Sequence, residues 1–248
     1  MNGVKRTFSA QLAAARPAPL VIVLHGNTQT GADMASRTSW PAVAKREHFT
    51  IVFPDGLRRA WADLRSSQMR AGHTPPEGTD DVVFVAALIE KYVADGTADP
   101  RHVYVTGLSN GSAMTMTLAC KRADLFAAAA SVIMNFTDEF ANACQPSQPV
   151  PMLMMNGTAD PLIPYKGGRG TSRFAVDGFW SAEKTIAFWR KVNGCEEGDA
   201  GHDRSGGHRM PGSFPDSRFS RLVNFIFGPQ NHDIDGAETI WTFFKRFP

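Results

Sequence analysis

The chain has 248 residues, of which 43% are hydrophobic, so it is long enough to bury a full core as one domain. Its 26 basic and 24 acidic side chains leave a net charge of +2, which excludes the strong positive field that nucleic acids or anionic membranes require. The longest apolar stretch, residues 125–134, is shorter than the ~18 residues of a membrane-spanning helix. We therefore expect one soluble domain over residues 1–248, with no nucleic acid and no membrane as partner.

The N-terminus and the cysteines bear on the cellular compartment. Residues 1–20 lack the apolar segment of a secretory signal, as expected for a cytoplasmic protein or for one whose signal was removed before numbering began. Three cysteines are too few for a disulfide scaffold and show no metal-ligand spacing, so no metal site is expected. A Cys120–Cys144 disulfide, with Cys195 free, and three free thiols are both compatible with the sequence.

Continuous apolar runs of strand length alternate with helical patterns along the chain. Runs that do not alternate with polar residues are typical of strands buried on both faces of a parallel sheet. The sequence predicts strands at residues 20–25, 50–53, 102–106, 128–133 and 151–155.

Helical spacing and end signals mark the segments between and after these strands. The clearest helix is expected at residues 80–94, behind a cap supplied by Thr79 or Asp80. Further helices are expected at 181–193 and at 236–246, the latter behind Asp235. This alternation predicts an α/β fold of three layers, a mostly parallel sheet between helices, with its active edge at the carboxyl ends of the strands.

Residues 107–111, Gly-Leu-Ser-Asn-Gly, match the G-x-S-x-G pattern of a nucleophile elbow. They follow the expected strand 102–106 and precede a helical run, which is the setting that such an elbow needs. Glycines on either side allow a turn so tight that side chains there would collide with neighbouring backbone. The pattern predicts Ser109 as a nucleophile and the backbone N–H of Asn110 as an oxyanion donor. An ordinary glycine-rich turn is the alternative interpretation.

A second oxyanion donor is predicted after the expected strand 20–25. This strand ends in His25 and a glycine, the position from which hydrolases of this kind supply the second N–H, here that of Asn27 or Thr28. His25 itself precedes the serine in the chain, whereas the base of this fold comes last, so we expect it to have a structural role.

The acid and the base are expected downstream of the serine. Asp160 follows the expected strand 151–155, where the order Ser…Asp…His places the residue that orients the imidazole. The base must then be His202, His208 or His232. His232 lies between a strand-like run and a helix, and His208 lies in a glycine-rich loop, so the pattern leaves the choice open.

Several segments are specific enough to indicate a family. They are LHGNTQTGADM, FPDGL, DDVVFVAALIE, VYVTGLSNGSAM, FAAAASV, NGTADPLIPYKGG, FWRKVNGC, GGHRMPG and HDIDGAETIWTFFKRF. On these segments, which extend over nearly the whole chain, it resembles the family of extracellular polyhydroxybutyrate depolymerases, feruloyl esterases and acetylxylan esterases. This family is a branch of the α/β-hydrolases.

The resemblance assigns roles by position. It implies Ser109 as nucleophile and Asp160 as acid, in agreement with the motifs. The family histidine stands in a G-G-H-x-W-P-G segment, matched here by residues 206–212, which implies His208 as the base in preference to His232.

The chain departs from the family pattern near this histidine. Met210 replaces the family tryptophan, a change expected to alter the acyl pocket at which it would contact the substrate. Trp61, Trp180 and Phe179 are candidates to flank an aryl or polymer chain, and packing in the core is the alternative role for these tryptophans. Residues 195–208 are shorter than the corresponding family segment, which normally includes the strand that delivers the histidine.

The resemblance implies a serine carboxylesterase that acts through an acyl-enzyme, without metal or organic cofactor. Its substrates would be polyesters, or hydroxycinnamoyl or acetyl esters of polysaccharides. It also implies a secreted or periplasmic location. Two alternatives stay open: an acyltransferase that uses the same residues, and a polymer-binding protein inactivated by the short segment 195–208. The oligomeric state is not indicated.

Overall fold

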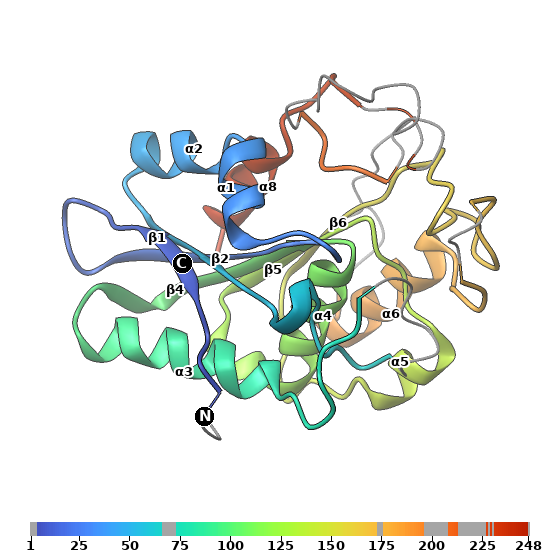
Figure 1. The fold of residues 1–248 in the computed structure, drawn as a ribbon, viewed down its shortest axis with the longest axis horizontal. Helices are drawn as coiled ribbons and strands as arrows, with labels where there is room; N and C mark the ends of the chain where they lie inside the picture. The colour runs from blue at the N-terminus through green and yellow to red at the C-terminus, as the bar shows by residue number, and fades with distance from the viewer. Residues whose placement is uncertain are drawn as a thin grey trace.

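The computed structural model describes residues 4–65, 73–172, 176–195, 208–212 and 231–247, together with Phe227 and Pro229. Within these residues a six-stranded sheet has the order β1-β3-β2-β4-β5-β6, with helices on both of its faces (Figure 1). The expected α/β architecture is therefore confirmed. In the described parts of the chain, each helix is too short or too polar to cross a lipid bilayer.

The strands are β1 (Phe8–Gln11), β2 (Ala18–Leu24), β3 (Thr50–Pro54), β4 (Ala98–Leu108), β5 (Ala128–Val132) and β6 (Met152–Met155). β2 to β6 correspond to the five expected strands and pair in parallel. β1 was not expected, and it pairs antiparallel with β3 at the edge of the sheet. Its side chains are mostly exposed, so it lacks the apolar run that marks the others.

The helices are α1 (Gly31–Arg37), α2 (Trp40–Glu47), α3 (Asp81–Ala94), α4 (Asn110–Lys121), α5 (Asp138–Ala143), α6 (Ala182–Asn193) and α8 (Gly236–Phe244). The expected helices correspond to α3, α6 and α8, although α8 ends at Phe244 and not at residue 246. Asp235 caps α8 as predicted, and of Thr79 and Asp80 it is Asp80 that caps α3, since each aspartate side chain accepts a hydrogen bond from an amide of the first turn.

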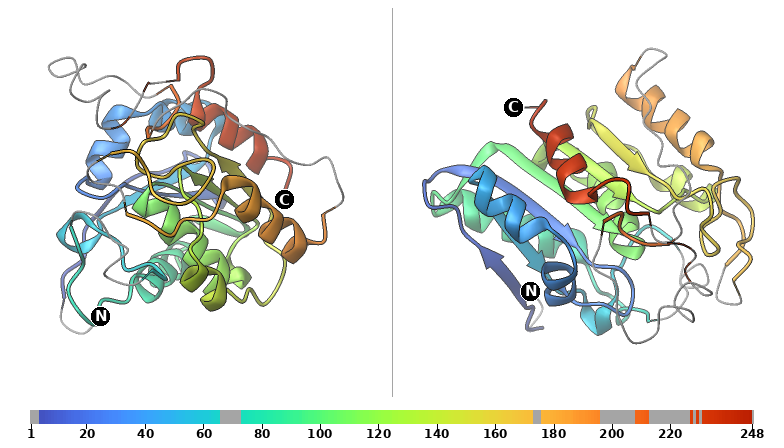
Figure 2. Two further views of the ribbon diagram at one scale, coloured as in Figure 1. Left: turned by 90° about the vertical axis from the view of Figure 1, so that its right-hand side faces the viewer. Right: turned by 90° about the horizontal axis from the view of Figure 1, so that it is seen from above.

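Two hydrophobic clusters lie on opposite faces of the sheet. Within β2, Leu20, Ile22 and Leu24 belong to one cluster and Val21 and Val23 to the other, and all five are 0% exposed. Successive side chains of a strand point to opposite faces, so a strand covered on both sides must be apolar throughout. Helices α3, α4 and α6 complete the first cluster, and α1, α2 and α8 complete the second (Figure 2).

Polar contacts fix α8 against the N-terminal part of the chain. The Arg46 guanidinium of α2 donates to both carboxylate oxygens of Glu238, at 2.7 and 2.6 Å. Ser39 Oγ lies 2.6 Å from Asp235 Oδ1 at the start of α8. The C-terminal helix is thus held at α2, on the same face of the sheet.

A disulfide joins Cys120, near the end of α4, to Cys144, which follows α5. Their Cα atoms are 4.9 Å apart, and 24 positions separate them in the chain. Cys195 is a free and exposed thiol. Of the two possibilities that the sequence allowed, the structure contains the Cys120–Cys144 bridge.

Candidate active site

Ser109 occupies a sharp turn between β4 and α4. Its backbone has φ 54° and ψ −115°, which non-glycine residues adopt only when the surrounding structure imposes it. A Cβ atom on Gly107 would overlap the Gly111 carbonyl, and one on Gly111 would overlap the carbonyls of Leu24 and His25. Both glycines are therefore required by close backbone contacts, as the motif predicted.

The structure brings Ser109, Asp160 and His208 together at the carboxyl ends of the strands. His208 Nε2 lies 2.8 Å from Ser109 Oγ, and His208 Nδ1 lies 2.7 Å from Asp160 Oδ2. Asp160 and His208 are buried, at 7% and 9% exposed. A carboxylate can only accept, so Nδ1 carries the proton and Nε2 is left to accept the hydrogen bond from the serine hydroxyl.

The loop after β6 fixes the Asp160 carboxylate. Asp160 Oδ1 accepts hydrogen bonds from the backbone N–H groups of Leu162 and Ile163, at 2.8 and 2.9 Å. This leaves Oδ2 for the imidazole. The loop that supplies the acid thus also sets the direction in which it can hold a histidine.

The segment that carries His208 is attached to its neighbours by backbone hydrogen bonds. The amide of His208 donates to the Phe227 carbonyl at 2.5 Å. The amide of Gly212 donates to Asn231, and the amide of Gly236 donates to Pro211, both at 3.0 Å. The last two bonds tie the histidine segment to Asn231 and to Gly236, the first residue of α8.

The other histidines are placed differently. His232 is exposed, and within the described residues it has no hydrogen bond to Ser109 or Asp160. His202 lies outside the described residues.

His25 is fully buried: its Nε2 accepts from the Gly56 amide at 2.9 Å, which leaves Nδ1 to donate to the Gly26 carbonyl at 2.7 Å. Burial lowers the pKa of His25, so this residue is a neutral structural link between two loops.

The predicted oxyanion donors differ in availability. The amides of Asn27 and Asn110 have no acceptor among the described residues. The Thr28 amide donates to the Arg59 carbonyl at 2.9 Å, so it is already used within the fold. Of the two donors that the sequence left open beside Asn110, Asn27 is therefore the one that the geometry favours.

Both asparagine side chains pair with backbone groups. Asn27 Nδ2 donates to the His73 carbonyl at 2.6 Å, and the His73 amide donates to Asn27 Oδ1 at 2.8 Å. Asn110 Oδ1 accepts from the Trp61 amide at 2.8 Å, and Asn110 Nδ2 donates to the Trp61 carbonyl at 3.2 Å. These pairs restrain the two residues whose amides were predicted to bind the oxyanion. Sequence reasoning did not anticipate them, because their partners are backbone atoms.

Three of the four expected substrate contacts, Trp61, Phe179 and Met210, are buried, and Trp180 stays a prediction. Trp61 is 0% exposed and its indole N–H donates to the His25 carbonyl at 2.9 Å, so it is a core residue with no surface to offer a substrate. Met210 is 4% exposed and packs against Gly236. Trp180 remains partly exposed, with its indole N–H bonded to Asp138 at 2.6 Å. Contact with the substrate was expected from the chemical type of these residues. Trp61 and Met210 are too deeply buried to make such a contact.

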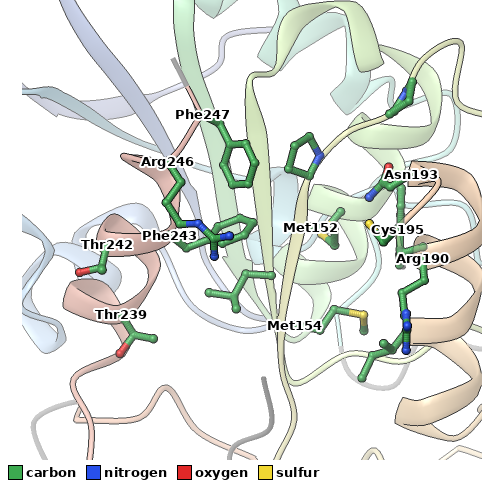
Figure 3. A pocket seen from close by; sticks show the side chains of 15 residues that line it. Met152, Met154, Arg190, Asn193, Cys195, Thr239, Thr242, Phe243, Arg246 and Phe247 are labelled. Carbon is green, nitrogen blue, oxygen red and sulfur yellow. The ribbon is translucent and has the colours of Figure 1, made fainter. Parts of the chain in front are cut away.

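A cavity of about 700 Å³ lies beside β6, between α6 and α8 (Figure 3). Met154, Trp189, Cys195, Phe243 and Arg246 are among its lining residues. The lining includes none of the three residues that meet at the serine turn. The cavity is therefore separate from the candidate active site.

Comparison with known proteins assigns the family. A family model described as "Esterase PHB depolymerase" matches residues 7–146, which is more than half of the chain. The chain belongs to this esterase family. The match includes Ser109 but ends before Asp160 and His208, so in this family member the arrangement of these two residues rests on the geometry above.

Curated relatives of this family member include enzymes named for two kinds of ester. Feruloyl esterase B of Piromyces equi is 28% identical over 76% of the chain and 35% of its own length. Poly(3-hydroxyalkanoate) depolymerase C of Paucimonas lemoignei is 32% identical over 46% of the chain and 27% of its own length. Feruloyl esterase C of Emericella nidulans is 27% identical over 88% of the chain and 71% of its own length. The chain thus spans only about a third of the length of feruloyl esterase B and about a quarter of the length of the depolymerase.

Solved structures of esterases share the fold of this family member. The Bacillus cereus carboxylesterase superposes with a TM-score of 0.61 at 11% identity, covering 99% of this chain and 96% of that one. The acetyl xylan esterase of Aspergillus awamori gives a TM-score of 0.58 at 16% identity, covering 88% and 93%. At these identities the likeness shows the α/β-hydrolase fold alone.

Proposed function

We propose that this esterase is a serine carboxylesterase in which Ser109 is the nucleophile, His208 the base and Asp160 the acid that orients it. The observation that carries the proposal is the position of the His208 imidazole, 2.8 Å from Ser109 Oγ on one side and 2.7 Å from Asp160 on the other. Burial of the acid and the imidazole strengthens the electrostatic coupling between them, because water screens it poorly there.

In the proposed acylation step, Ser109 Oγ attacks the ester carbonyl carbon while His208 Nε2 takes the hydroxyl proton. The carbonyl oxygen becomes an oxyanion, which the amides of Asn110 and Asn27 stabilise. Asp160 stabilises the imidazolium that forms and keeps the proton on Nδ1. As the C–O bond breaks, His208 gives its proton to the leaving alcohol, and the acyl group remains on the serine.

Deacylation repeats these roles with water as the nucleophile. His208 takes a proton from water as the water attacks the acyl carbon, and returns a proton to Ser109 Oγ when the acid departs. An alcohol in place of water would give a transferase. The ratio of acid to new ester formed in the presence of an added alcohol therefore separates hydrolysis from acyl transfer.

For the substrate we propose polyesters or hydroxycinnamoyl or acetyl esters of polysaccharides. The names of the relatives, feruloyl esterases and a poly(3-hydroxyalkanoate) depolymerase, support this range. Product release from a polyhydroxyalkanoate film, from methyl ferulate and from acetylated xylan, measured side by side, would rank the three classes.

The test of the proposed chemistry is Ser109→Ala, assayed on a p-nitrophenyl ester of a short acid. The expected loss in kcat is on the order of 10⁴–10⁶-fold. Ser36→Ala, at an exposed serine of α1, is the matched control and should keep the wild-type rate. Labelling by a fluorophosphonate probe should occur in wild type and fail in Ser109→Ala. An unlabelled wild type would favour a polymer-binding protein without activity.

We also propose that the protein works in an oxidising compartment, outside the cytoplasm. The Cys120–Cys144 disulfide supports this, since such bonds persist where thiols are not kept reduced. Fractionation of the source cells, followed by immunoblotting under non-reducing conditions, tests it.

A further inference from the structure

Asp63 and Arg65 form an ion pair that is buried beside the serine turn. Both residues are 6% exposed. Arg65 Nε donates to Asp63 Oδ1 and Arg65 Nη2 donates to Oδ2, each at 2.8 Å, and the Arg65 amide donates to Oδ1 at 2.9 Å. Removing two charges from water is costly, so a buried pair is weak evidence for a purely stabilising role. Its contacts indicate another use.

The Asp63 carboxylate also holds the residue that follows Ser109. Asp63 Oδ2 accepts a hydrogen bond from Asn110 Nδ2 at 2.7 Å. At the other end of the same side-chain amide, Asn110 Oδ1 accepts from the Trp61 amide at 2.8 Å. Asn110 is 4% exposed, so water does not compete for these bonds. Its side chain is therefore fixed at both its oxygen and its nitrogen.

Fixing this side chain restrains the backbone to which it is attached. Asn110 is the first residue of α4, where the amides have no acceptor within the helix. Its N–H must point at the place where the oxyanion forms, and hydrogen-bond strength falls steeply as the angle departs from linearity. A small rotation of the Asn110 peptide would weaken the hydrogen bond from its N–H to the oxyanion in the transition state. The contacts of His208 with Ser109 and Asp160 in the free protein would stay in place.

The same loop also holds the opposite side of the proposed oxyanion hole. The Arg59 carbonyl accepts from the Thr28 amide at 2.9 Å, next to Asn27. The Gly56 amide donates to His25 Nε2, two residues before Asn27. Residues 56–65 thus contact both segments that were assigned an oxyanion donor.

We propose that Asp63, with its charge balanced by Arg65, is a positioning residue that holds the Asn110 amide in the oxyanion hole. This inference rests on the proposed function, because it concerns the donor that the serine mechanism uses. Arg65 is needed because an unbalanced carboxylate so close to the site would oppose the negative charge of the oxyanion.

The test exchanges the donor and the acceptor of the Asp63–Asn110 hydrogen bond. Asp63→Asn removes the carboxylate charge and leaves only the weaker amide oxygen as acceptor for Asn110 Nδ2, and Asn110→Asp places two carboxylates in contact. Asp63→Asn should lower kcat about tenfold and Asn110→Asp on the order of 10²-fold, with KM little changed, since the donor is displaced and not removed. The double variant, Asp63→Asn with Asn110→Asp, relieves the contact between carboxylates and should have a higher kcat than Asn110→Asp alone, while staying below wild type because its carboxylate lies beside the oxyanion.

A surface ion pair with the same geometry provides the matched control. The Arg101 amide and its Nε donate to Asp99 Oδ1 at 3.0 and 3.2 Å, and its Nη2 donates to Asp99 Oδ2 at 2.9 Å. Asp99→Asn breaks an equivalent pair far along β4 from the serine and should leave kcat within about twofold of wild type. If Asp63→Asn fails to fold, Asn110→Ala removes this hydrogen bond, together with the two that the Asn110 side chain makes to Trp61, without changing any charge, and a loss of at least about tenfold in kcat is expected.

Two readouts separate positioning from a merely structural role. Affinity for a trifluoromethyl ketone, which forms a tetrahedral oxyanion on the serine, should fall by the same factor as kcat. The amide resonance of Asn110 in a ¹H–¹⁵N spectrum should shift in Asp63→Asn and not in Asp99→Asn. A lower melting temperature with unchanged kcat, ketone affinity and Asn110 resonance overturns the inference. Hydrolysis that survives in Ser109→Ala overturns the proposed function instead, and the Asn110 resonance still tests the position of the amide.

Discussion

The Nε2 atom of His208 lies 2.8 Å from Ser109 Oγ, although 99 positions separate the two residues in the chain. The serine comes from the turn between β4 and α4, and the imidazole from the segment that precedes α8. Parallel strands end at one edge of the sheet, so loops distant in sequence meet there. Contact between these two side chains therefore depends on the packing of α8 as well as on the serine turn.

Replacing His208 by Gln should abolish most of the activity, because no other described side chain lies between Ser109 and Asp160. We expect kcat on a p-nitrophenyl ester to fall about 10⁴-fold or more. The matched change His232→Gln alters an exposed residue and should leave the rate as in wild type. The reverse pattern, with His232 essential and His208 dispensable, would show that the other candidate is the base.

The Gly111→Ala variant tests the close contact that allows the serine turn. Its new Cβ would overlap the carbonyls of Leu24 and His25, so α4 must move away from β2. Overpacking of this kind lowers the free energy of unfolding by about 1–3 kcal/mol, and a displaced nucleophile costs on the order of 10²-fold in kcat.

Gly96→Ala separates these two effects. Gly96 has φ +74°, and a Cβ added there would meet no atom within 4 Å, so alanine carries only the backbone penalty of about 1–2 kcal/mol. Urea unfolding and kcat should both change in Gly111→Ala, whereas only stability should change in Gly96→Ala. Full activity in Gly111→Ala would contradict the steric argument.

The Cys120–Cys144 disulfide should contribute measurably to stability. It closes a segment with a sequence separation of 24, for which the loss of chain entropy in the unfolded state corresponds to about 3 kcal/mol. A double Cys120→Ala, Cys144→Ala variant should melt several degrees lower, at roughly 2–4 °C per kcal/mol. Cys195→Ser, at the exposed free thiol, should melt as wild type does. A reductant should lower the melting temperature of wild type and leave the double variant unchanged.

Glu47 makes the contact between α2 and α8 sensitive to acid. The Trp241 indole N–H, the Arg46 guanidinium and the Lys245 ammonium lower the pKa of Glu47 from 4.5 to about 2. A carboxyl whose pKa is lower in the folded state stabilises the fold above its unfolded pKa, and this contribution is lost as the pH falls from 4.5 towards 2.

The variant Glu47→Gln should therefore lose less unfolding free energy than wild type when urea titrations at about pH 6 and about pH 3 are compared. Trp241→Phe removes the indole N–H donor together with part of the ring that packs on Phe49. The packing loss is the same at both pH values, so the variant should give an intermediate loss. Equal losses in Glu47→Gln and wild type would show that this carboxylate is not coupled to folding.

The sheet could be predicted largely from the sequence because its strands are buried on both faces. A strand such as β2 is apolar at every position, and no surface residue interrupts the pattern. β1 has mostly exposed side chains, and its pairing with β3 is set by tertiary contacts. The short helices α1, α2 and α5 were not located either, since six to eight residues carry too few turns for a clear period.

The candidate site could be predicted where a short sequence motif decides. Gly107 is required by a contact within the serine turn and Gly111 by the backbone at the end of β2, and both belong to the motif. Asp160 follows from the order of strands. The choice between His208 and His232 depends on how one loop is placed in space, which residue type does not encode. The same holds for Thr28, whose amide is occupied by the distant Arg59 carbonyl, and for Trp61, whose burial depends on packing across the whole layer.

The hydrogen bonds that join the histidine segment to α8 have a consequence for the order in which the molecule matures. The Gly236 amide joins this segment to α8, and Arg46 of α2, much earlier in the chain, holds α8 through Glu238. During synthesis on the ribosome, the serine turn can form while the residues of α8 are still untranslated. Its hydroxyl would then lack a proton acceptor. Under the proposed mechanism, the nascent chain would therefore react with esters far more slowly until α8 docks.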